Sequence, residues 1–280
     1  ELWFSNGTES GTYPIPINNE SYRIYNPVDG TASPPSLYEE YDTATGSSFP
    51  KNLTPFNKNL YFTANDGLNG VELWSINNRG LGEKIVKDID PDGSSTPDEL
   101  TVVGNKLYFT ADDGNGRKLW VLKNQNKVEK VANSGAEPRH LTEVDGKLYY
   151  SATSAQGREP WVVKGGRATQ LQDINPGIRS SNPKQFQLAR RETKKGTKKF
   201  LYFSANGGER GVELWTQNIS QGRAKAEQLA DLYSGAPSSD PRHLTNSNEQ
   251  LFFTANDGKT GRELWTLDAP VGVDDTTDPS

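Results

Sequence analysis

Two histidines occupy the same place in two copies of a repeated phrase, and histidine is a versatile chemical group at neutral pH. His140 lies in Pro-Arg-His-Leu-Thr over residues 138–142, and His243 lies in the same phrase over residues 241–245. A metal centre needs about three converging ligands, whereas the chain has two histidines and no cysteine. We therefore expect a solvated loop position here, with contact to a bound ligand as the alternative.

Acidic residues recur at Asp-Gly turns and raise the question of calcium. Asp66, Asp113 and Asp257 each precede a glycine. A calcium loop gathers roughly six to eight oxygen ligands, and each of these turns offers only one or two acids. Asp and Gly also suit a tight hairpin, because such turns need positive φ angles. We expect structural turns and no cofactor, with bound calcium as the alternative.

A basic segment interrupts this otherwise acidic chain over residues 190–199. The whole chain has 31 basic and 36 acidic residues and a net charge of −5. The basic residues of the segment are Arg190, Arg191, Lys194, Lys195, Lys198 and Lys199. Such a run is usually a solvated loop tip, and it could also bind an acidic partner such as a polyanionic sugar. No aromatic side chains interleave with the charges, so nucleic acid is not expected as a partner.

Aromatic side chains could stack on sugar rings, but most of them recur in register along the chain. A tryptophan at one phase of every repeat is expected to lie in the core, where its large apolar area is most stabilising. Tyr22 and Tyr25 lie in an irregular N-terminal segment instead. They are the candidates for an exposed aromatic contact with a partner.

The chain carries no recognisable catalytic signature. It contains no phosphate-binding loop, no nucleophile elbow and no paired zinc-ligand motif. Acid–base chemistry would fall to carboxylates, and a glycosidase needs two of them at a set separation. Nothing in the sequence selects such a pair. We predict a protein without enzymatic activity, with a glycan-active enzyme that uses channel carboxylates as the alternative.

A repeat governs where all these residues lie. Five copies combine a Leu-aromatic-aromatic run, a turn and a phrase like Glu-Leu-Trp, and the first copy covers residues 60–74. The five repeat tryptophans are 41 to 54 residues apart, and a sixth Glu-Leu-Trp opens the chain over residues 1–3. A period of this length is typical of the four-stranded blade of a β-propeller.

One unit shows how such a blade is expected to be built. β-forming residues predict strands over 97–103, 106–111, 118–122 and 127–131, and the turns between them are rich in Gly, Asn and Asp. No segment has a convincing 3.6-residue period, so we expect an all-β fold with little helix. The basic segment falls at the first of these turns in its own unit and is predicted to be a lengthened hairpin.

The number of blades depends on the first 44 residues. In a six-bladed ring, which we favour, residues 1–44 form a degenerate first blade. In the five-bladed alternative, residues 1–17 supply closing strands to the last blade and residues 18–44 are an insertion. Trp3 would then be a surplus, because Trp265 already marks a third strand in the last blade.

Domain limits follow from the extent of the repeat. We expect one β-propeller domain over residues 1–268, and a disordered tail or linker over residues 269–280 because that segment is short, acidic and outside the repeat. The chain contains no methionine, which fits a processed or truncated product.

The repeated phrase resembles a known bacterial family. Glu-Leu-Trp-Phe-Ser-Asn-Gly-Thr over residues 1–8 is similar to the ELWxxDGT repeat, and Val-Lys-Asp-Ile-Asp-Pro-Asp-Gly-Ser-Ser over residues 86–95 is similar to the linking phrase of that family. The resemblance implies β-propeller-like modules in exported or surface proteins and assigns no catalytic residue. The chain departs from the pattern over residues 18–44 and at Pro160, which cannot donate a strand hydrogen bond.

These features favour a non-catalytic, exported β-propeller in the periplasm, at the cell surface or outside the cell. It would act as a binding or assembly module whose partner is another protein or a surface glycan. No apolar run approaches the length of a membrane span, so direct membrane insertion is not expected. A calcium-stabilised structural module is a further alternative.

Overall fold

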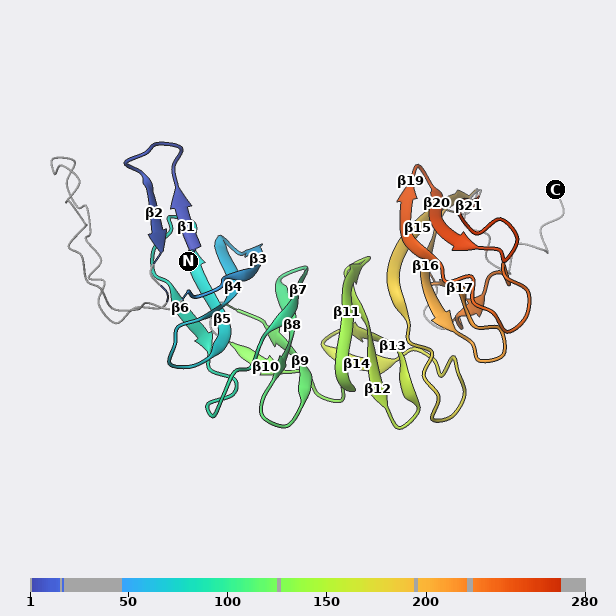
Figure 1. Ribbon diagram of the computed structural model, residues 1–280, viewed down its shortest axis with the longest axis horizontal. Coiled ribbons are helices and arrows are strands. Elements are labelled where there is room, and N and C mark those ends of the chain that lie inside the picture. The colour runs from blue at the N-terminus through green and yellow to red at the C-terminus, as the bar shows by residue number, and fades with distance from the viewer. Residues whose placement is uncertain are drawn as a thin grey trace.

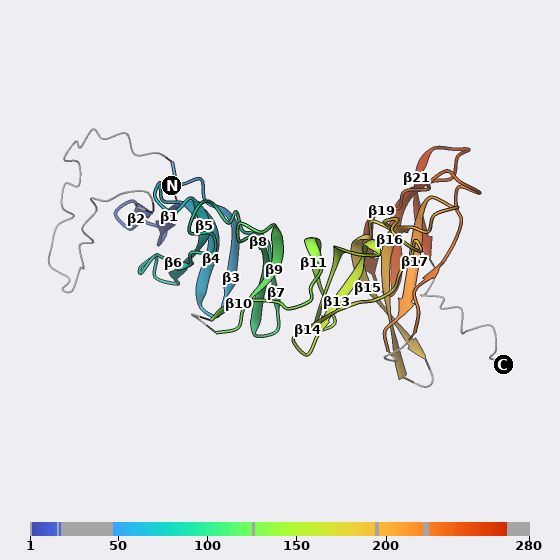
Figure 2. The same ribbon diagram turned by 90° about the horizontal axis from the view of Figure 1, so that it is seen from below.

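The structure is a computed structural model in which every regular element is a β-strand. The described residues are 2–15, 17, 47–124, 127–193, 196–220 and 224–267. Their strands form six antiparallel sheets that follow one another along the chain. Figure 1 shows the sheets arranged one after another in an arc, and Figure 2 shows the same arc from below. The prediction of an all-β chain built from four-stranded units is confirmed.

The sheets keep the order of the repeat. The first contains β1 (Leu2–Ser5) and β2 (Thr12–Ile15). The second contains β3 (Lys51–Phe56), β4 (Asn59–Asn65), β5 (Val71–Asn77) and β6 (Lys84–Lys87). The third contains β7 (Asp98–Val103), β8 (Lys106–Asp112), β9 (Arg117–Leu122) and β10 (Val128–Lys130).

The later sheets repeat this meander. The fourth contains β11 (Ala136–Val144), β12 (Lys147–Ser154), β13 (Gly157–Lys164) and β14 (Arg167–Gln170). The fifth contains β15 (Lys184–Thr193), β16 (Gly196–Asn206), β17 (Val212–Asn218) and β18 (Glu227–Gln228). The sixth contains β19 (Arg242–Ser247), β20 (Gln250–Asn256) and β21 (Arg262–Leu267).

The strands of the third sheet lie where the sequence predicts them. Its four strands agree with the predicted segments to within a residue at each end. The agreement has a simple cause, because Gly104-Asn105 at the first turn tolerates positive φ and the flanking runs are rich in β-formers. The basic segment is likewise a lengthened hairpin, formed by β15 and β16.

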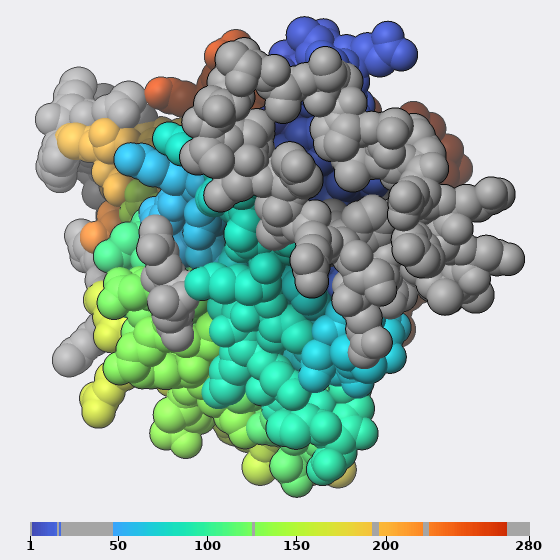
Figure 3. Space-filling view, turned by 90° about the vertical axis from the view of Figure 1, so that its left-hand side faces the viewer, coloured from blue at the N-terminus to red at the C-terminus, as the bar shows by residue number. Residues whose placement is uncertain are grey.

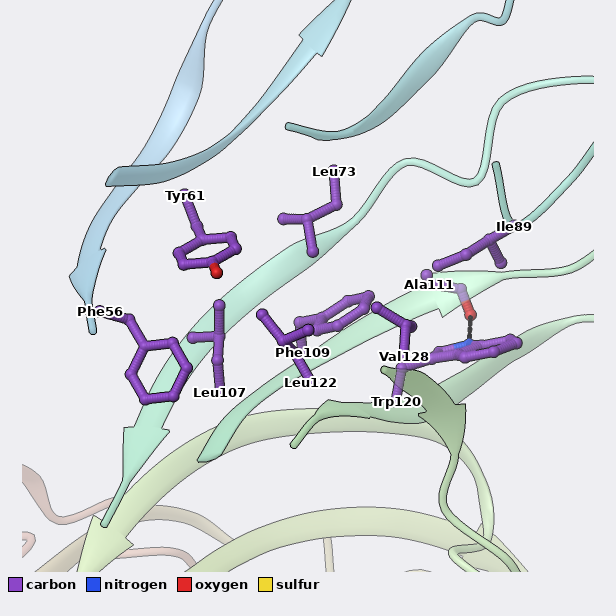
Figure 4. Packing of buried hydrophobic residues seen from close by; sticks show 10 residues of the cluster. All are labelled: Phe56, Tyr61, Leu73, Ile89, Leu107, Phe109, Ala111, Trp120, Leu122 and Val128. Carbon is purple, nitrogen blue, oxygen red and sulfur yellow. Dashed lines mark hydrogen bonds between the residues drawn. The ribbon is translucent and has the colours of Figure 1, made fainter. Parts of the chain in front are cut away.

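Each interior sheet buries both of its faces against its neighbours. In one such layer, Tyr61 and Leu73 of the second sheet pack on Leu107, Phe109 and Trp120 of the third. Figure 4 shows these side chains interleaved between the two sheets. Alternation along a strand sends successive side chains to opposite faces, so the Leu and Trp of one Glu-Leu-Trp phrase enter different layers.

The repeat tryptophans lie in the core, as predicted. Trp74, Trp120, Trp161 and Trp215 are buried, and Trp265 is partly buried. In four of these five the indole N–H donates to an alanine carbonyl on the adjacent second strand, at 3.0 to 3.2 Å. A buried tryptophan needs such a partner for its N–H. These rings therefore hold the sheets together and are not available for stacking on sugars.

The arc does not close into a ring within the described residues. Strands β1 and β2 form their own sheet and pack on the second sheet through Leu2, Ile15 and Ile17. They pair with each other and not with the last sheet, which has three strands. Figure 1 shows β1–β2 and β19–β21 at opposite ends of the arc. Within the described residues the expected ring of six blades is therefore not confirmed, because the sheets at the two ends of the arc have two and three strands.

Candidate binding edge

The first strands of the five larger sheets form the inner edge of the arc. We use the name inner edge for β3, β7, β11, β15 and β19, which lie along its concave side in Figure 1. Successive first strands contact one another from β3 to β19. The sequence predicts a solvated loop position for His140 and His243, whereas the structure places both within first strands, in β11 and β19.

Every inner-edge strand contains a β-bulge at the same repeat position. The pairing with the second strand shifts register there in all five sheets. One residue at each bulge has a left-handed backbone with φ between 53° and 60°, and these are Asn52, Glu99, His140, Gln185 and His243. A bulge re-aims a side chain and is a common device beside binding sites. The five positions therefore present a row of different polar groups.

Three of these bulge side chains reach to the next sheet along the arc. Glu99 accepts a hydrogen bond from the backbone N–H of Leu141 at 2.7 Å. Gln185 accepts from the N–H of Leu244 at 3.3 Å. The amide of Asn52 donates to the carbonyl of Pro97 at 3.4 Å. The bulge position thus fastens neighbouring first strands together.

The two histidines do not make this inter-sheet contact. Within the described residues the His140 ring forms no hydrogen bond, and the ring of His243 lies 3.4 Å from the hydroxyl of Thr254 in its own sheet. The pKa of His140 is lowered, chiefly because neighbouring groups of the inner edge displace part of the water around its ring. The negative charge of Glu99 raises this pKa, and the nearby cations lower it further. Both imidazoles are solvent-exposed.

Positive charge gathers around the inner edge near the histidines. Asp240 is the shared partner of Arg242 at 2.6 Å, Arg262 at 3.1 Å and Lys184 at 3.8 Å. One carboxylate therefore faces three cations. Arg139, beside His140, is exposed and its guanidinium makes no hydrogen bond within the described part of the chain.

Some of these cations have a structural role as well. Arg158 donates to the carbonyl of Glu137 at 2.7 Å, in the second residue of β11. Arg262 donates to the carbonyl of Asp240 at 2.9 Å, just before β19. Both arginines open a third strand and tie it to the start of the first strand. Arg139 and Arg242, on the first strands beside the two histidines, have exposed side chains.

The basic hairpin lies at the other end of the sheets. The bulges follow the start of the first strand, whereas β15–β16 turns over at its end, and Figure 2 shows this hairpin projecting beyond its neighbours. Asp145 binds Lys199 at 2.7 Å and lies 3.6 Å from Arg190. One carboxylate of the adjacent sheet therefore faces two of the cations.

The remaining basic candidates divide between described and undescribed positions. Arg191 and Lys198 are part of β15 and β16. Lys194 and Lys195 lie outside the described residues, as do Tyr22 and Tyr25. The hairpin and the two histidines therefore do not form a common site.

The three Asp-Gly turns are separate and close on themselves. Asp66 accepts from the N–H groups of Leu68 and Asn69, and Asp257 accepts from those of Lys259 and Thr260. Asp113 accepts a side-chain hydrogen bond from Lys130, which lowers its pKa. Among the described residues no group of three metal-ligating side chains converges. These turns have the geometry predicted for structural hairpin turns.

The glutamate of the repeated phrase has a role that sequence reasoning missed. Glu72, Glu159 and Glu213 are fully buried between sheets. Glu159 shows the pattern: it accepts from the N–H of Ile174 at 2.9 Å, from the N–H of Ser181 at 2.9 Å and from the hydroxyl of Ser181 at 2.7 Å. The serine lies in the linker to the next sheet. The available signal was the recurrence of a Ser-Ser pair after each of these glutamates, with the bonded serine 22 to 26 residues further on.

Burial gives these glutamates perturbed acidities. Desolvation raises the pKa of Glu72, Glu159 and Glu213, and the hydrogen bonds from their serines partly oppose it. A raised carboxyl pKa is often a mark of a general acid. Here the side chains have no exposed surface, so a substrate could not reach them. Their acidity follows from a structural contact between sheets.

No family model matches the chain, and no curated protein matches it. Among solved structures, one from a study of two prolyl endopeptidases matches with a TM-score of 0.51 and 11% identity, over 79% of this chain and 34% of that one. The designed protein Ika8 matches with a TM-score of 0.44 and 15% identity, over 79% of this chain and 59% of that one. A putative TolB from Agrobacterium tumefaciens matches with a TM-score of 0.39 and 14% identity, over 78% and 76%.

These likenesses concern the fold alone. The chain spans less than two thirds of the endopeptidase and of the designed protein. No helix among the described residues could span a membrane. The match to the endopeptidase and the succession of antiparallel sheets place this chain among the all-β repeats with a β-propeller-like fold.

Proposed function

We propose that this chain is a non-catalytic, exported module that binds an anionic partner along its inner edge. The partner would be an acidic surface glycan or an acidic protein. The observation that carries the proposal is the gathering of Lys184, Arg242 and Arg262 around the single carboxylate of Asp240. This excess of positive charge belongs to a chain whose net charge is −5. Export is proposed from the resemblance to the ELWxxDGT repeat.

We propose the absence of catalysis because the carboxyl groups with a raised pKa lie in the interior of the protein. Within the described residues, the carboxyls whose pKa is raised are Glu72, Glu159 and Glu213. All three are buried and hydrogen-bonded to linker serines or backbone. Glycoside hydrolysis needs an accessible acid beside a second carboxylate. Binding needs only the exposed, varied side chains that the bulges present.

A titration with a model polyanion tests the proposal. The probes are a poly-glutamate peptide and an acidic polysaccharide, each measured by calorimetry at low and high salt. The double variant Arg139→Ala/Arg242→Ala should lose about tenfold in affinity, because each lost charge contact costs roughly 0.7 kcal/mol near a protein surface. The matched control is Arg167→Ala, an exposed arginine on β14 at the outer side of the sheet that contains His140.

The pH dependence of the affinity is a second test of binding at the inner edge. Protonation of His140 adds positive charge to the edge, so affinity should rise as pH falls below neutrality. Because the pKa of His140 is lowered, this rise comes below 6.5. Equal affinity in the double variant and in Arg167→Ala would contradict the proposed edge. Loss of binding only in a variant of Arg190 and Lys199 would move the site to the basic hairpin.

A further inference from the structure

The last sheet exposes an apolar face that every preceding sheet of the repeat buries. Leu264 of β21 is 71% exposed, whereas its equivalents Leu73, Leu119 and Leu214 are at most 1% exposed. The third-strand leucine points toward the following sheet, as Leu73 and Leu214 show. Phe252 on β20 shares this face and is partly exposed, while the equivalent tyrosines are buried. No sheet follows β19–β21 in the described part of the chain.

The first sheet exposes the complementary side chain. Trp3 of β1 is 62% exposed, whereas Trp74, Trp120, Trp161 and Trp215 are between 5% and 8% exposed. The third-strand tryptophan points toward the preceding sheet, and among the described residues no sheet precedes β1. Trp3 pairs across the strands with Pro14, which is also exposed. Figure 3 looks onto this end of the arc, where part of the dark-blue hairpin is visible at the top.

The two end faces carry the same pair of side chains, a leucine and a tryptophan, that pack together between neighbouring sheets inside the arc. Leu214 of the fifth sheet packs in one layer with Trp265 of the sixth. The pairs Leu73–Trp120 and Leu119–Trp161 do the same between earlier sheets. Trp3 and Leu264 belong to the same repeated phrase as these pairs and are its two unburied members. Large apolar side chains exposed at a sheet face mark an interaction surface.

We propose that these two faces bind each other between two copies of this chain, head to tail. Leu264 and Phe252 of one copy would pack on Trp3 and Pro14 of the next, which continues the succession of sheets across the contact. A head-to-tail contact uses different surfaces on the two partners and builds either a closed ring or an open filament. This proposal goes beyond binding at the inner edge and uses none of its residues.

The size of the contact sets the expected strength. Inside the arc a complete sheet covers each such face, whereas here a two-stranded hairpin covers it. Less apolar area is removed from water, so association should be weaker than the packing of internal sheets. We expect reversible oligomers whose size increases with protein concentration. Sedimentation velocity over a wide concentration range measures this directly.

Two single variants and their mixture test the head-to-tail geometry. Leu264→Asp removes one face in every copy and Trp3→Asp removes the other, so each variant alone should be monomeric. An equal mixture should recover a dimer and no larger species, because one intact face remains on each variant. Recovery in the mixture also shows that both variants are folded. Ile178→Asp is the matched control, since Ile178 is 87% exposed but away from both ends, and it should associate as the unaltered chain does.

Each other outcome contradicts the proposal in a recognisable way. A wild-type chain that stays monomeric at every concentration overturns it and leaves these faces to another segment of the same chain. If Leu264→Asp abolishes association while Trp3→Asp does not, the contact joins two identical ends. If the mixture fails to form a dimer, the two faces do not meet. Loss of polyanion binding by Arg139→Ala/Arg242→Ala would leave all of these results unchanged, so the two proposals fail independently.

Discussion

At the scale of single residues, the buried glutamates show how one carboxylate can join two sheets. Glu213 accepts from the N–H of Ser239 at 2.8 Å, from its hydroxyl, and from the N–H of Leu232 at 3.3 Å. Both donors lie in the linker that leads to the last sheet. Buried donors without a partner are costly, so the glutamate determines the path of this linker.

Replacing Glu213 tests that role with a control inside the same chain. Glu213→Ala leaves two backbone N–H groups and a hydroxyl without acceptors, and we expect a loss of about 3 kcal/mol in the free energy of unfolding. Glu263 holds the equivalent position in the last sheet but is exposed. Glu263→Ala should therefore change stability by less than about 0.5 kcal/mol. Urea unfolding measures both; equal losses would contradict the linking role.

At the scale of elements, the inner-edge bulges combine backbone strain with a useful side chain. A left-handed backbone costs roughly 1–2 kcal/mol for an L-residue other than glycine. The hydrogen bonds of Glu99 and Gln185 to the next first strand offset part of that cost. Where the residue is His140 or His243, this bond is missing and the imidazole faces solvent instead. The bulge therefore serves packing at some positions and is free for recognition at others.

Two substitutions at Gln185 separate the strain from the hydrogen bond. Gln185→Val loses the bond to Leu244 and places a β-branched residue at φ 60°, so we expect a loss of about 2–3 kcal/mol. Gln185→Gly loses the same bond but relieves the strain and should be less destabilising. Thermal unfolding of both variants decides the matter. A glycine variant less stable than the valine variant would argue against strain at the bulge.

At the scale of the whole molecule, the pKa shifts of several carboxyl groups together determine how the stability of the fold depends on pH. Glu72, Glu159 and Glu213 have a raised pKa because burial desolvates them. In Asp113 and Asp145, hydrogen bonds from lysines lower the pKa. As pH falls, the carboxyls with a raised pKa are protonated at a higher pH in the folded state than in the unfolded state. The carboxyls with a lowered pKa are protonated at a lower pH in the folded state.

The signs of these shifts give a testable pH profile. As pH falls from neutrality toward 4.5, protonation of Glu213 in the fold should increase the stability of the unaltered chain relative to Glu213→Gln, which has no charge to lose. Below 3.8, the stabilisation from Asp113 and Asp145 should be lost in both proteins. Melting temperatures across this range measure the difference. A difference that does not change between pH 7 and 4.5 would contradict the raised pKa.

Parts of the site could be predicted from sequence and parts could not. The sequence placed His140 and His243 at one repeat position, because the two phrases are identical, but it predicted a loop where the structure has first strands. The bulge at that position could not be predicted, since it depends on a left-handed residue that is not glycine. The cations around Asp240 come from β15, β19 and β21, while Asp240 itself lies in the loop before β19. Such a convergence needs the tertiary fold.

By itself, the sequence determined the strands and the succession of sheets, because turn residues, β-formers and the period of the repeat are local signals. It also determined that the repeat tryptophans lie in the core, since one phase of a strand faces one neighbour. Only the tertiary structure decided the open arc and the exposed ends at Trp3 and Leu264. The physical reason is that the repeated phrase supplies a leucine and a tryptophan that can pack on a neighbouring sheet, whether or not such a sheet is present. Whether a next sheet is present depends on how the two ends of the chain lie relative to each other.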